Sequence, residues 1–177
     1  MNLGWTFLNK DYFPLVKDFS CENQYISDYL RDPNFAINDS SLGETRTFLF
    51  LDKDNDNSLA GYSSIKCSSL RVEHEDYDGN LEIEVVPCIE IVMLARDISY
   101  QQMGAGEQIL YFMINYINRE LRPRVGIRAI TLFSVPNKVG FYEKKEFRRL
   151  DKGMEMYVHP TCERCIPMFL ALGRLDG

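Results

Sequence analysis

A glutamine-led glycine motif is the segment of this sequence best suited to hold an anion. Residues 101–106 read Gln-Gln-Met-Gly-Ala-Gly, a Q-x-x-G-x-G pattern between a strand-like run and a helix-like run. Glycines let the backbone approach a ligand closely, and a helix N-terminus offers unpaired N–H groups with partial positive charge. The motif therefore predicts a pyrophosphate site, although a strand-to-helix turn without any ligand fits the pattern equally well.

Other nucleotide-binding motifs do not fit this segment. It lacks the Lys-Ser/Thr pair of a P-loop, it lies in the middle of the chain, and no acidic residue of the dinucleotide-binding type closes a following parallel strand. A pyrophosphate of the coenzyme A type is the better interpretation.

Several motifs in order resemble the GNAT superfamily of N-acyltransferases. The run LARD (94–97) leading into YQQMGAG (100–106) resembles its strand end and Y-Q-x-x-G-x-G motif, and FYEK (141–144) with Phe147 resembles its F-Y-E-K-x-G-F element. FSCENQYISDYL, TRTF, GYSS and MFLALGRL resemble the branch that includes toxin-type acetyltransferases. The likeness spans about residues 19–175.

The resemblance implies that acetyl-CoA is the acyl donor. Backbone groups of a splayed central strand would bind its pantetheine and its thioester carbonyl, and these would come from Leu94, Ala95 and Arg96. Because that carbonyl gains negative charge during attack, fixed amides beside it would stabilise the reaction. The pyrophosphate would be held by a second set of residues, Gln101, Gln102, Met103, Gly104, Ala105, Gly106 and Glu107.

The resemblance also implies an acid for the reaction. Acetyl transfer to an amine needs a neutral nucleophile and a proton for the departing thiolate. Tyr142, in the F-Y-E-K element, is expected to donate that proton, whereas a tyrosine without such a context would more often be a buried aromatic residue.

Two positions depart from the family pattern. Glu146 stands where the family usually has glycine. Asn137 lies closer to Phe141 than the usual asparagine does, so it is not assigned a cofactor contact.

Glu90 is a second candidate catalytic residue. It lies four residues before Leu94 in a strand-like run, and the period of two places both side chains on one face. A carboxylate on an otherwise apolar, buried strand is costly unless it is paired or functional. Glu90 could take the proton of the amine through water, as a glutamate at this spacing does in some members of the superfamily, or form an ion pair with a core arginine.

Apolar runs predict most of a sheet. Residues 45–52 and 58–73 predict two strands joined across DNDN, and residues 81–96 predict a buried, central strand. Residues 128–135 predict another buried strand, and residues 137–147 a short helix or turn. MEMYV and MFLAL predict the last two strands.

Two longer helices are expected. In residues 19–31 apolar side chains recur at helical spacing, with Ser20 as a possible cap, and Pro33 should end the helix. After the glycine motif, an i, i+3, i+4 apolar stripe within residues 110–121 predicts a long amphipathic helix that Pro123 closes.

These elements predict an α+β (α/β) fold with a GNAT-like mixed, mostly antiparallel central sheet flanked by helices. The chain has 177 residues, 45% hydrophobic and 26% charged, which suits a single N-acetyltransferase domain over residues 1–177. The sequence shows neither a signal-peptide pattern nor an apolar run of membrane-spanning length, so we expect a cytoplasmic protein without a membrane partner.

The cysteines favour direct acetyl transfer over a covalent intermediate. Five cysteines form an odd, scattered set, so reduced thiols are the default expectation. Cys21, Cys67 and Cys88 fall within helix or strand patterns, where small buried thiols are usual.

No metal site is expected. Residues 52–57 resemble the start of a calcium-binding loop. Asn57 stands in place of the required glycine and Ser63 in place of the bidentate glutamate, so a hairpin turn is the better prediction. His159, Cys162 and Cys165 have zinc-like spacing but no nearby fourth ligand.

The predicted function is acetyl transfer from acetyl-CoA to a primary amine of a small molecule or a protein. One alternative is the toxin of a toxin–antitoxin pair that acetylates aminoacyl-tRNA, and another is a non-catalytic CoA-binding regulator. The net charge of −6 opposes nonspecific binding of nucleic acid, which weakens the tRNA hypothesis. A homodimer through the last strands is compatible with the sequence.

Two charged runs bear on the acceptor. The basic run 144–152 could hold the 3′-phosphate of the cofactor, a tRNA backbone, or only water. The acidic run 73–84 would favour a cationic acceptor if it bordered the cleft, but a solvated surface is the simpler interpretation.

Overall fold

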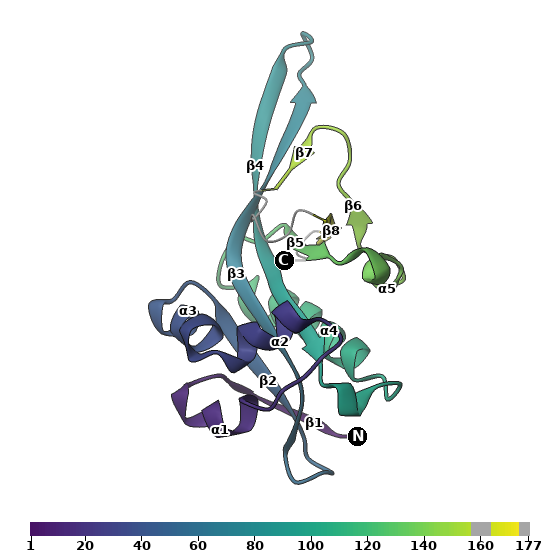
Figure 1. The fold of residues 1–177 in the computed structure, drawn as a ribbon. Helices are drawn as coiled ribbons and strands as arrows, with labels where there is room; N and C mark the ends of the chain where they lie inside the picture. The colour runs from purple at the N-terminus through teal and green to yellow at the C-terminus, as the bar shows by residue number, and fades with distance from the viewer. Residues whose placement is uncertain (157–163, 174–177) are drawn as a thin grey trace. The chain divides into compact units, whose positions relative to one another are not determined.

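The fold is known from a computed structural model, which describes residues 1–156 and 164–173. Its eight strands form one sheet in the order β1-β2-β3-β4-β5-β8-β6, with β7 pairing with β3 (Figure 1). The β4–β5 pair is parallel, whereas β1–β2, β2–β3, β3–β7, β5–β8 and β6–β8 are antiparallel. A mixed, mostly antiparallel sheet with helices confirms the predicted fold class, and β4 is the central strand, as expected.

The strands have the following bounds: β1 Leu3–Phe7, β2 Arg46–Asp52, β3 Ser58–Glu75, β4 Leu81–Arg96, β5 Ala129–Ser134, β6 Arg148–Arg149, β7 Met154–Glu155 and β8 Ile166–Ala171. The α-helices are α1 Phe13–Val16, α2 Gln24–Arg31, α3 Asn38–Leu42, α4 Ala105–Tyr116 and α5 Val139–Glu143. Shorter 3-10 or π segments are η1 Lys10–Tyr12, η2 Pro33–Ile37, η3 Ile98–Tyr100, η4 Ile117–Leu121 and η5 Pro136–Lys138.

The chain forms two compact units, one of Met1–Lys66 with Val92–Tyr116 and one of Cys67–Ile91 with Ile117–Gly177. The long strands β3 and β4 each contribute to both units. The single domain expected from the sequence therefore stays a prediction, and each unit is described by itself.

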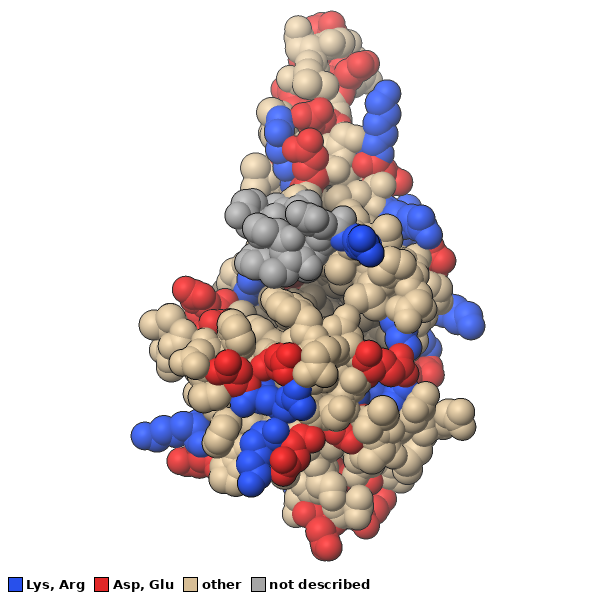
Figure 2. Space-filling model, in the orientation of Figure 1, with Lys and Arg blue, Asp and Glu red and all other residues tan. Residues whose placement is uncertain are grey.

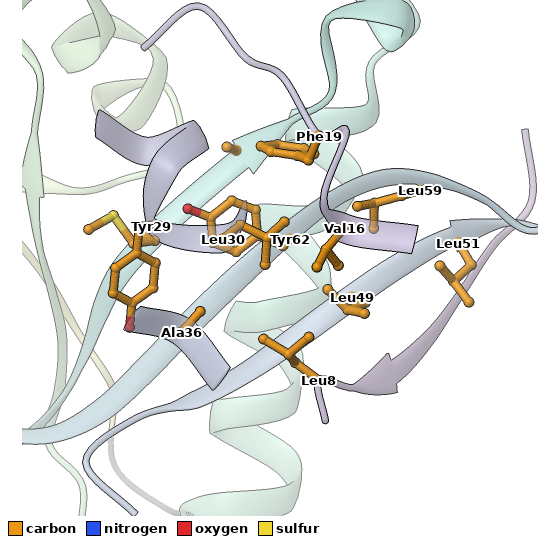
Figure 3. Packing of buried hydrophobic residues seen from close by; sticks show 12 residues of the cluster. Leu8, Val16, Phe19, Tyr29, Leu30, Ala36, Leu49, Leu51, Leu59 and Tyr62 are labelled. Carbon is orange, nitrogen blue, oxygen red and sulfur yellow. The ribbon is translucent and has the colours of Figure 1, made fainter. Parts of the chain in front are cut away.

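The first unit buries both faces of its strands. Figure 3 shows Val16 and Leu30, from the short N-terminal helices, packed over Leu49 and Tyr62 of β2 and β3. Adjacent residues of a strand face opposite ways, and accordingly Phe48 contacts Tyr116 of α4, with ring centroids 4.9 Å apart. Helices therefore cover the strands of this unit on both sides.

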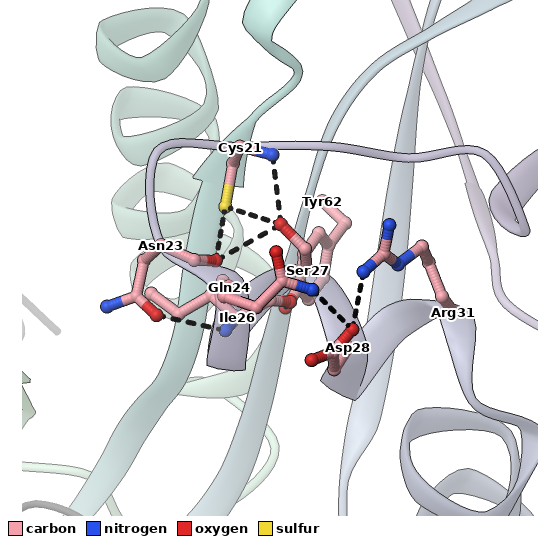
Figure 4. Close-up of polar contacts among 8 residues, drawn as sticks. All are labelled: Cys21, Asn23, Gln24, Ile26, Ser27, Asp28, Arg31 and Tyr62. Atoms are coloured by element: carbon pink, nitrogen blue, oxygen red, sulfur yellow. Dashed lines mark hydrogen bonds and ion pairs between the residues drawn. The ribbon is translucent and has the colours of Figure 1, made fainter.

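The start of α2 differs from the sequence prediction. The helix begins at Gln24, and the cap is Asn23, whose side chain accepts a hydrogen bond from the Ile26 amide at 3.3 Å. Ser27 accepts from the Cys21 amide at 3.0 Å and donates to the Asn23 carbonyl at 3.1 Å (Figure 4). The predicted start at residue 19 and the predicted Ser20 cap are wrong, whereas the end before Pro33 is confirmed.

Ser20 has long-range partners instead of a capping role. Its amide donates to the Asp97 carboxylate at 3.1 Å, and its carbonyl accepts from the Ile98 amide at 2.8 Å. These bonds tie the loop before α2 to the segment that follows β4.

The helix after the glycine motif is confirmed. It comprises α4 and η4 and ends at Leu121, before Pro123. In the first unit, Leu110 and Met113 of α4 are buried, as the predicted apolar stripe requires, and Ile109 is buried as well.

The second unit has its own apolar core. Leu70 of β3, Val86 and Cys88 of β4 and Ala129 of β5 pack together, and Met156 packs with them. The strand predicted for 128–135 is β5, and the short helix predicted within 137–147 is α5. Of the two final strands, MFLAL is observed within β8 with shifted ends, whereas MEMYV gives the short β7 and then leaves the described residues.

The β2–β3 hairpin confirms another prediction. A turn joins Asp52 to Ser58, and Asp56 and Asn57 within it have φ of 48° and 57°. This is the hairpin expected in place of a calcium loop.

The acidic run 73–84 lies on the β3–β4 hairpin, where acidic side chains gather (Figure 2). Two of them lie close to basic side chains: Arg71 lies 2.8 Å from Glu73, and the His74 Nε2 lies 3.3 Å from Glu82. Arg128 also contacts Glu84. This part of the second unit thus has the features of a solvated surface.

Among the described residues, none of the helices has the length and apolar character needed to cross a bilayer.

Candidate active site

The glycine motif forms the turn between η3 and α4 in the first unit. Gln102 and Gly104 have φ of 65° and 75°, in the left-handed region that favours glycine. A β-carbon built at Gly104 would meet no heavy atom within 4 Å. At the other end of the motif, Ala105 is fully buried and packs with Ala60 and Tyr100. The turn is therefore anchored on the core but open at Gly104.

Backbone amides at the start of α4 are available to an anion. Among the described residues, the amides of Gln102, Gly104, Ala105 and Gly106 donate to no protein acceptor. The first bond of the helix runs from the Gln108 amide to the Gly104 carbonyl at 3.1 Å. Unpaired amides, together with the partial positive charge of a helix start, suit a phosphate group.

The end of β4 lies beside this turn. Gly61 of β3 packs directly on it, because a β-carbon there would lie 2.4 Å from the Ala95 carbonyl oxygen and 3.0 Å from the Arg96 Cα. The close approach of two backbones requires glycine. From the same strand end, the Arg96 side chain brings its Cδ to 4.0 Å from the β-carbon position of Gly106. The structure thus brings Arg96 and the glycine motif together within one unit.

Arg96 contributes a side chain that the sequence prediction did not use. Its Nη2 lies 2.7 Å from Oε1 of Glu22, in the loop before α2. The sequence indicated only backbone groups from Leu94, Ala95 and Arg96. A guanidinium at this end of α4 adds positive charge to a site suited to phosphate.

Tyr142 lies in α5 of the second unit, and the end of that helix fixes its position. The Phe147 amide donates to the Tyr142 carbonyl at 3.2 Å, and the Glu146 amide donates to the Glu143 carbonyl at 3.1 Å. These are the two bonds of a Schellman motif, with Glu146 as the left-handed residue at φ 68°. The accompanying apolar contact is between the Tyr142 and Phe147 rings, whose centroids are 5.8 Å apart.

The Tyr142 hydroxyl remains protonated at neutral pH. Burial raises the pKa of Tyr142 to about 12, because an ionised phenol would lose hydration there. Among the described residues the hydroxyl has no hydrogen-bond partner. A protonated phenol with no partner among the described residues is able to donate to a substrate.

Glu146 carries a backbone strain that glycine would relieve. We predict that Glu146→Gly raises the free energy of unfolding by about 1 kcal/mol, because left-handed geometry costs an L-residue roughly that much. Thermal denaturation should show a midpoint roughly 2–4 °C higher for a chain of this size. Glu146→Ala is the matched control, since it removes the same side chain but keeps the β-carbon. An equal gain in both variants would point to the glutamate side chain and not to the backbone.

Glu90 lies in β4 of the second unit and is 7% exposed. Its Oε2 accepts a hydrogen bond from Ser68 Oγ of β3 at 3.3 Å. On its other side Glu90 is the register partner of Thr131 in β5. The sequence did not indicate Ser68 or Thr131, because only the strand register brings them beside Glu90.

The cysteine thiols differ in their surroundings. Cys88 is buried, and burial raises the pKa of its thiol to about 11, which makes it a poor nucleophile. Cys21 is half-buried in the loop before α2 and donates to the Asn23 carbonyl at 3.2 Å. Cys67 is exposed on β3, so the expectation that it is buried is wrong. Within the described residues no group of three or more His, Cys, Asp or Glu side chains could hold a metal ion, and His159 and Cys162 lie outside those residues.

No protein-family model matches the chain. Solved structures match almost all of it. A structure described as a bacterial toxin is 20% identical, with a TM-score of 0.75 over 96% of this chain and 90% of its own. A tyrosine-to-phenylalanine mutant of the toxin AtaT, solved with acetyl-CoA and the C-terminus of the antitoxin AtaR, is 16% identical. Its TM-score is 0.72 over 97% of this chain and 94% of its own.

A tyrosine-to-phenylalanine mutant of KacT is 15% identical, with a TM-score of 0.73 over 97% of this chain and 95% of its own. AtaT has also been solved with acetyl-methionyl-tRNAfMet. AtaT and KacT are toxin-type acetyltransferases of the GNAT class. At this level of identity the likeness shows the fold, which is the one that the sequence motifs resemble.

Proposed function

We propose that this protein is an acetyl-CoA-dependent N-acetyltransferase that moves the acetyl group directly to a primary amine. The observation that carries the proposal is the open turn at Gly104, with the unpaired amides of Gln102, Ala105 and Gly106 beside it. A left-handed glycine with open space around it at a helix start suits the pyrophosphate of CoA. The AtaT structure with acetyl-CoA supports the choice of this donor.

The remaining donor contacts are assigned to the neighbouring strand end. Leu94, Ala95 and Arg96 would meet the pantetheine and the thioester carbonyl, and the Arg96 guanidinium would add charge near the phosphates. Gln101, Met103 and Glu107 flank the open amides and complete the proposed cradle, in which Met103 is 53% exposed. Bound there, acetyl-CoA supplies an activated acyl group.

Tyr142 is the proposed acid. As the amine nitrogen bonds to the thioester carbon and the C–S bond breaks, the thiolate takes the proton of the Tyr142 hydroxyl. The raised pKa keeps that proton in place through neutral pH. AtaT and KacT have each been solved with a tyrosine replaced by phenylalanine, which is consistent with a functional role for a tyrosine in this fold.

Glu90 is the proposed base. The attacking nitrogen must lose one proton, and a carboxylate that is 7% exposed is a suitable group to receive it. An ion pair with a core arginine is the other hypothesis for this residue.

The acceptor with most support is the amino group of aminoacyl-tRNA. The fold matches toxins, and AtaT has been solved with acetyl-methionyl-tRNAfMet. In this chain Lys144, Arg148 and Arg149 follow Tyr142 in the basic run, and Arg148 and Arg149 are exposed in β6. The net charge of −6 opposes nonspecific RNA binding, so such an acceptor would need this local patch.

Labelled acetyl-CoA incubated with the protein and a charged total tRNA pool tests the proposal. We expect label in the RNA fraction, and its loss on prior deacylation of the tRNA, because only the aminoacyl group carries a nucleophilic amine. A parallel reaction with small amines and a protein mixture tests the broader activity. Label in those fractions alone would exclude the tRNA acceptor but keep the acetyltransferase, and no transfer to any acceptor would contradict both.

A further inference from the structure

Among the described residues, the first part of β4 has a strand neighbour on one side only (Figure 1). In the second unit β5 pairs with β4 only over residues 88–91, and β3 lies on the other side. Just after β3, the Asp76 amide donates to the Asn80 carbonyl at 2.9 Å. The Arg128 amide donates to the Pro87 carbonyl at 2.9 Å, from the side of β5. The backbone of residue 80 therefore faces β3, and that of residue 87 faces away from it.

The alternation between these two points assigns the outward backbone groups. In an antiparallel pair, the amide and carbonyl of one residue face the same side, and the direction changes at the next residue. Leu81, Ile83 and Val85 therefore direct theirs away from β3, in the same sense as Pro87. On that side, no backbone group of the described residues bonds to them. An edge of this kind is able to accept a further strand.

The same residues form an apolar row, defined as Leu81, Ile83 and Val85. Their side chains are 64%, 53% and 65% exposed, and they share one face of β4 because alternate residues of a strand point the same way. Edge strands of soluble proteins are usually kept short or blunted by charge, which prevents unwanted pairing. An exposed apolar row beside outward backbone groups has instead the properties of a binding surface.

The residues between them are acidic, which restricts the partner. Glu82 and Glu84 point to the opposite face of β4. They belong to the acidic run 73–84, which contains six acidic residues and neither lysine nor arginine. Arg71 and Arg128 compensate part of this charge but not all of it. A second copy paired antiparallel at this edge would bring glutamates beside glutamates, and this repulsion disfavours it.

We propose that this edge of β4 binds an extended peptide segment of a protein partner, which adds a strand to the sheet. Its backbone would bond to the outward groups of residues 81–85, and its apolar side chains would cover the apolar row. Its lysine or arginine side chains, on the other face, would lie beside Glu82 and Glu84. Backbone bonds would supply affinity, and the alternation of apolar and basic residues would supply specificity. None of these residues is assigned to acetyl transfer, so the inference goes beyond the proposed function.

A fluorescein-labelled peptide of four lysines alternating with three valines tests the proposal by fluorescence anisotropy. We expect saturable binding that weakens when NaCl is raised from about 50 to about 500 mM, because exposed ion pairs are screened. Two control peptides should bind at least about 10-fold more weakly, since each loses one of the two matched faces. One has the same composition with its valines together, and the other has glutamate in place of lysine.

Hydrogen exchange followed by NMR locates the bound peptide. In the free protein the amides of Leu81, Ile83 and Val85 should exchange quickly, whereas those of Glu82 and Glu84, which face β3, should exchange more slowly. Addition of the lysine–valine peptide should protect the first set and leave the second unchanged. Protection elsewhere in the chain, with none at this edge, would contradict the proposal.

Ile83→Pro separates the edge from the fold, because the amide that it removes is not part of the β3–β4 ladder. The variant should keep its thermal midpoint and bind the lysine–valine peptide about 10-fold more weakly, as for one lost backbone bond. If its midpoint falls, Glu82→Gln decides instead, since it leaves the backbone intact. That variant should lower the affinity about 3- to 5-fold, as for one exposed ion pair, whereas Asp78→Asn, the matched loss of one charge in the turn, should not.

The proposal is overturned if the alternating peptide does not bind, or if the glutamate peptide binds equally well. Unchanged affinity in both Ile83→Pro and Glu82→Gln would also overturn it. A wild-type dimer in which the amides of the apolar row are protected without any peptide would show that a second copy covers the edge, which contradicts the proposed partner.

Discussion

Replacing Tyr142 by phenylalanine is expected to lower the rate of acetyl transfer by about 10²–10⁴-fold, the usual range for a positioned acid. The thiolate would then leave without its proton. The fold should be unaffected, because phenylalanine keeps the ring beside Phe141 and Phe147, with centroids 5.0 and 5.8 Å away, and the hydroxyl has no partner among the described residues to lose. Acetyl-CoA affinity, measured by calorimetry, should stay the same.

Tyr77→Phe is the control for this substitution. Tyr77 is fully exposed in the β3–β4 turn of the same unit, so the same loss of a hydroxyl should change nothing. If Tyr142→Phe transferred acetyl groups at the wild-type rate, the acid would have to be another group. If neither protein transferred any acetyl group yet both bound acetyl-CoA, the hypothesis of a non-catalytic CoA-binding regulator would be favoured.

The parts of the fold that the sequence predicted well are those with long, uninterrupted patterns. β4 and α4 are 16 and 12 residues long, and the apolar pattern within each predicts its type without reference to distant contacts. β1 was missed because its five residues, LGWTF, carry little signal of their own. It is stabilised by pairing with β2 and by contacts of Trp5 with Phe48 and Phe112, each at 5.5 Å between ring centroids.

The start of α2 shows how a tertiary contact overrides a local preference. Ser20 and Asn23 are both good capping residues, so the sequence alone cannot separate them. Ser20 is instead bonded to Asp97, 77 positions away, and the helix begins after Asn23. Ser68 and Thr131 were missed for a related reason, since their place beside Glu90 follows from register and not from any local motif.

The glycine motif was predicted from sequence because its chemistry is local. The sequence alone could not distinguish a ligand site from a turn without a ligand, because both require glycine. The structure adds an observation in favour of a ligand site, namely space: among the described residues, a β-carbon at Gly106 would have a single neighbour within 4 Å, the Arg96 Cδ at 4.0 Å. The packing of the described residues therefore does not require glycine at position 106.

Gly106→Leu is therefore expected to separate stability from cofactor binding. Leucine is a better helix former than glycine by roughly 0.5–1 kcal/mol, so the thermal midpoint should stay the same or rise. Acetyl-CoA affinity should fall about 100-fold or more, roughly 2.8 kcal/mol, because the side chain would occupy the space that the pyrophosphate needs. Calorimetric titration and thermal denaturation of the same preparation measure both quantities.

Gly126→Leu is the matched control, since a β-carbon at Gly126 also meets nothing within 4 Å but lies in the loop before β5. That variant should bind acetyl-CoA like the wild type. Equal binding by Gly106→Leu would place the cofactor phosphates away from α4, whereas a fall in both stability and affinity would mean that the leucine disturbs the helix. The proposed pyrophosphate site is supported only if Gly106→Leu is as stable as the wild type and no longer binds acetyl-CoA. Steric exclusion of a ligand does not change the stability of the protein without its ligand.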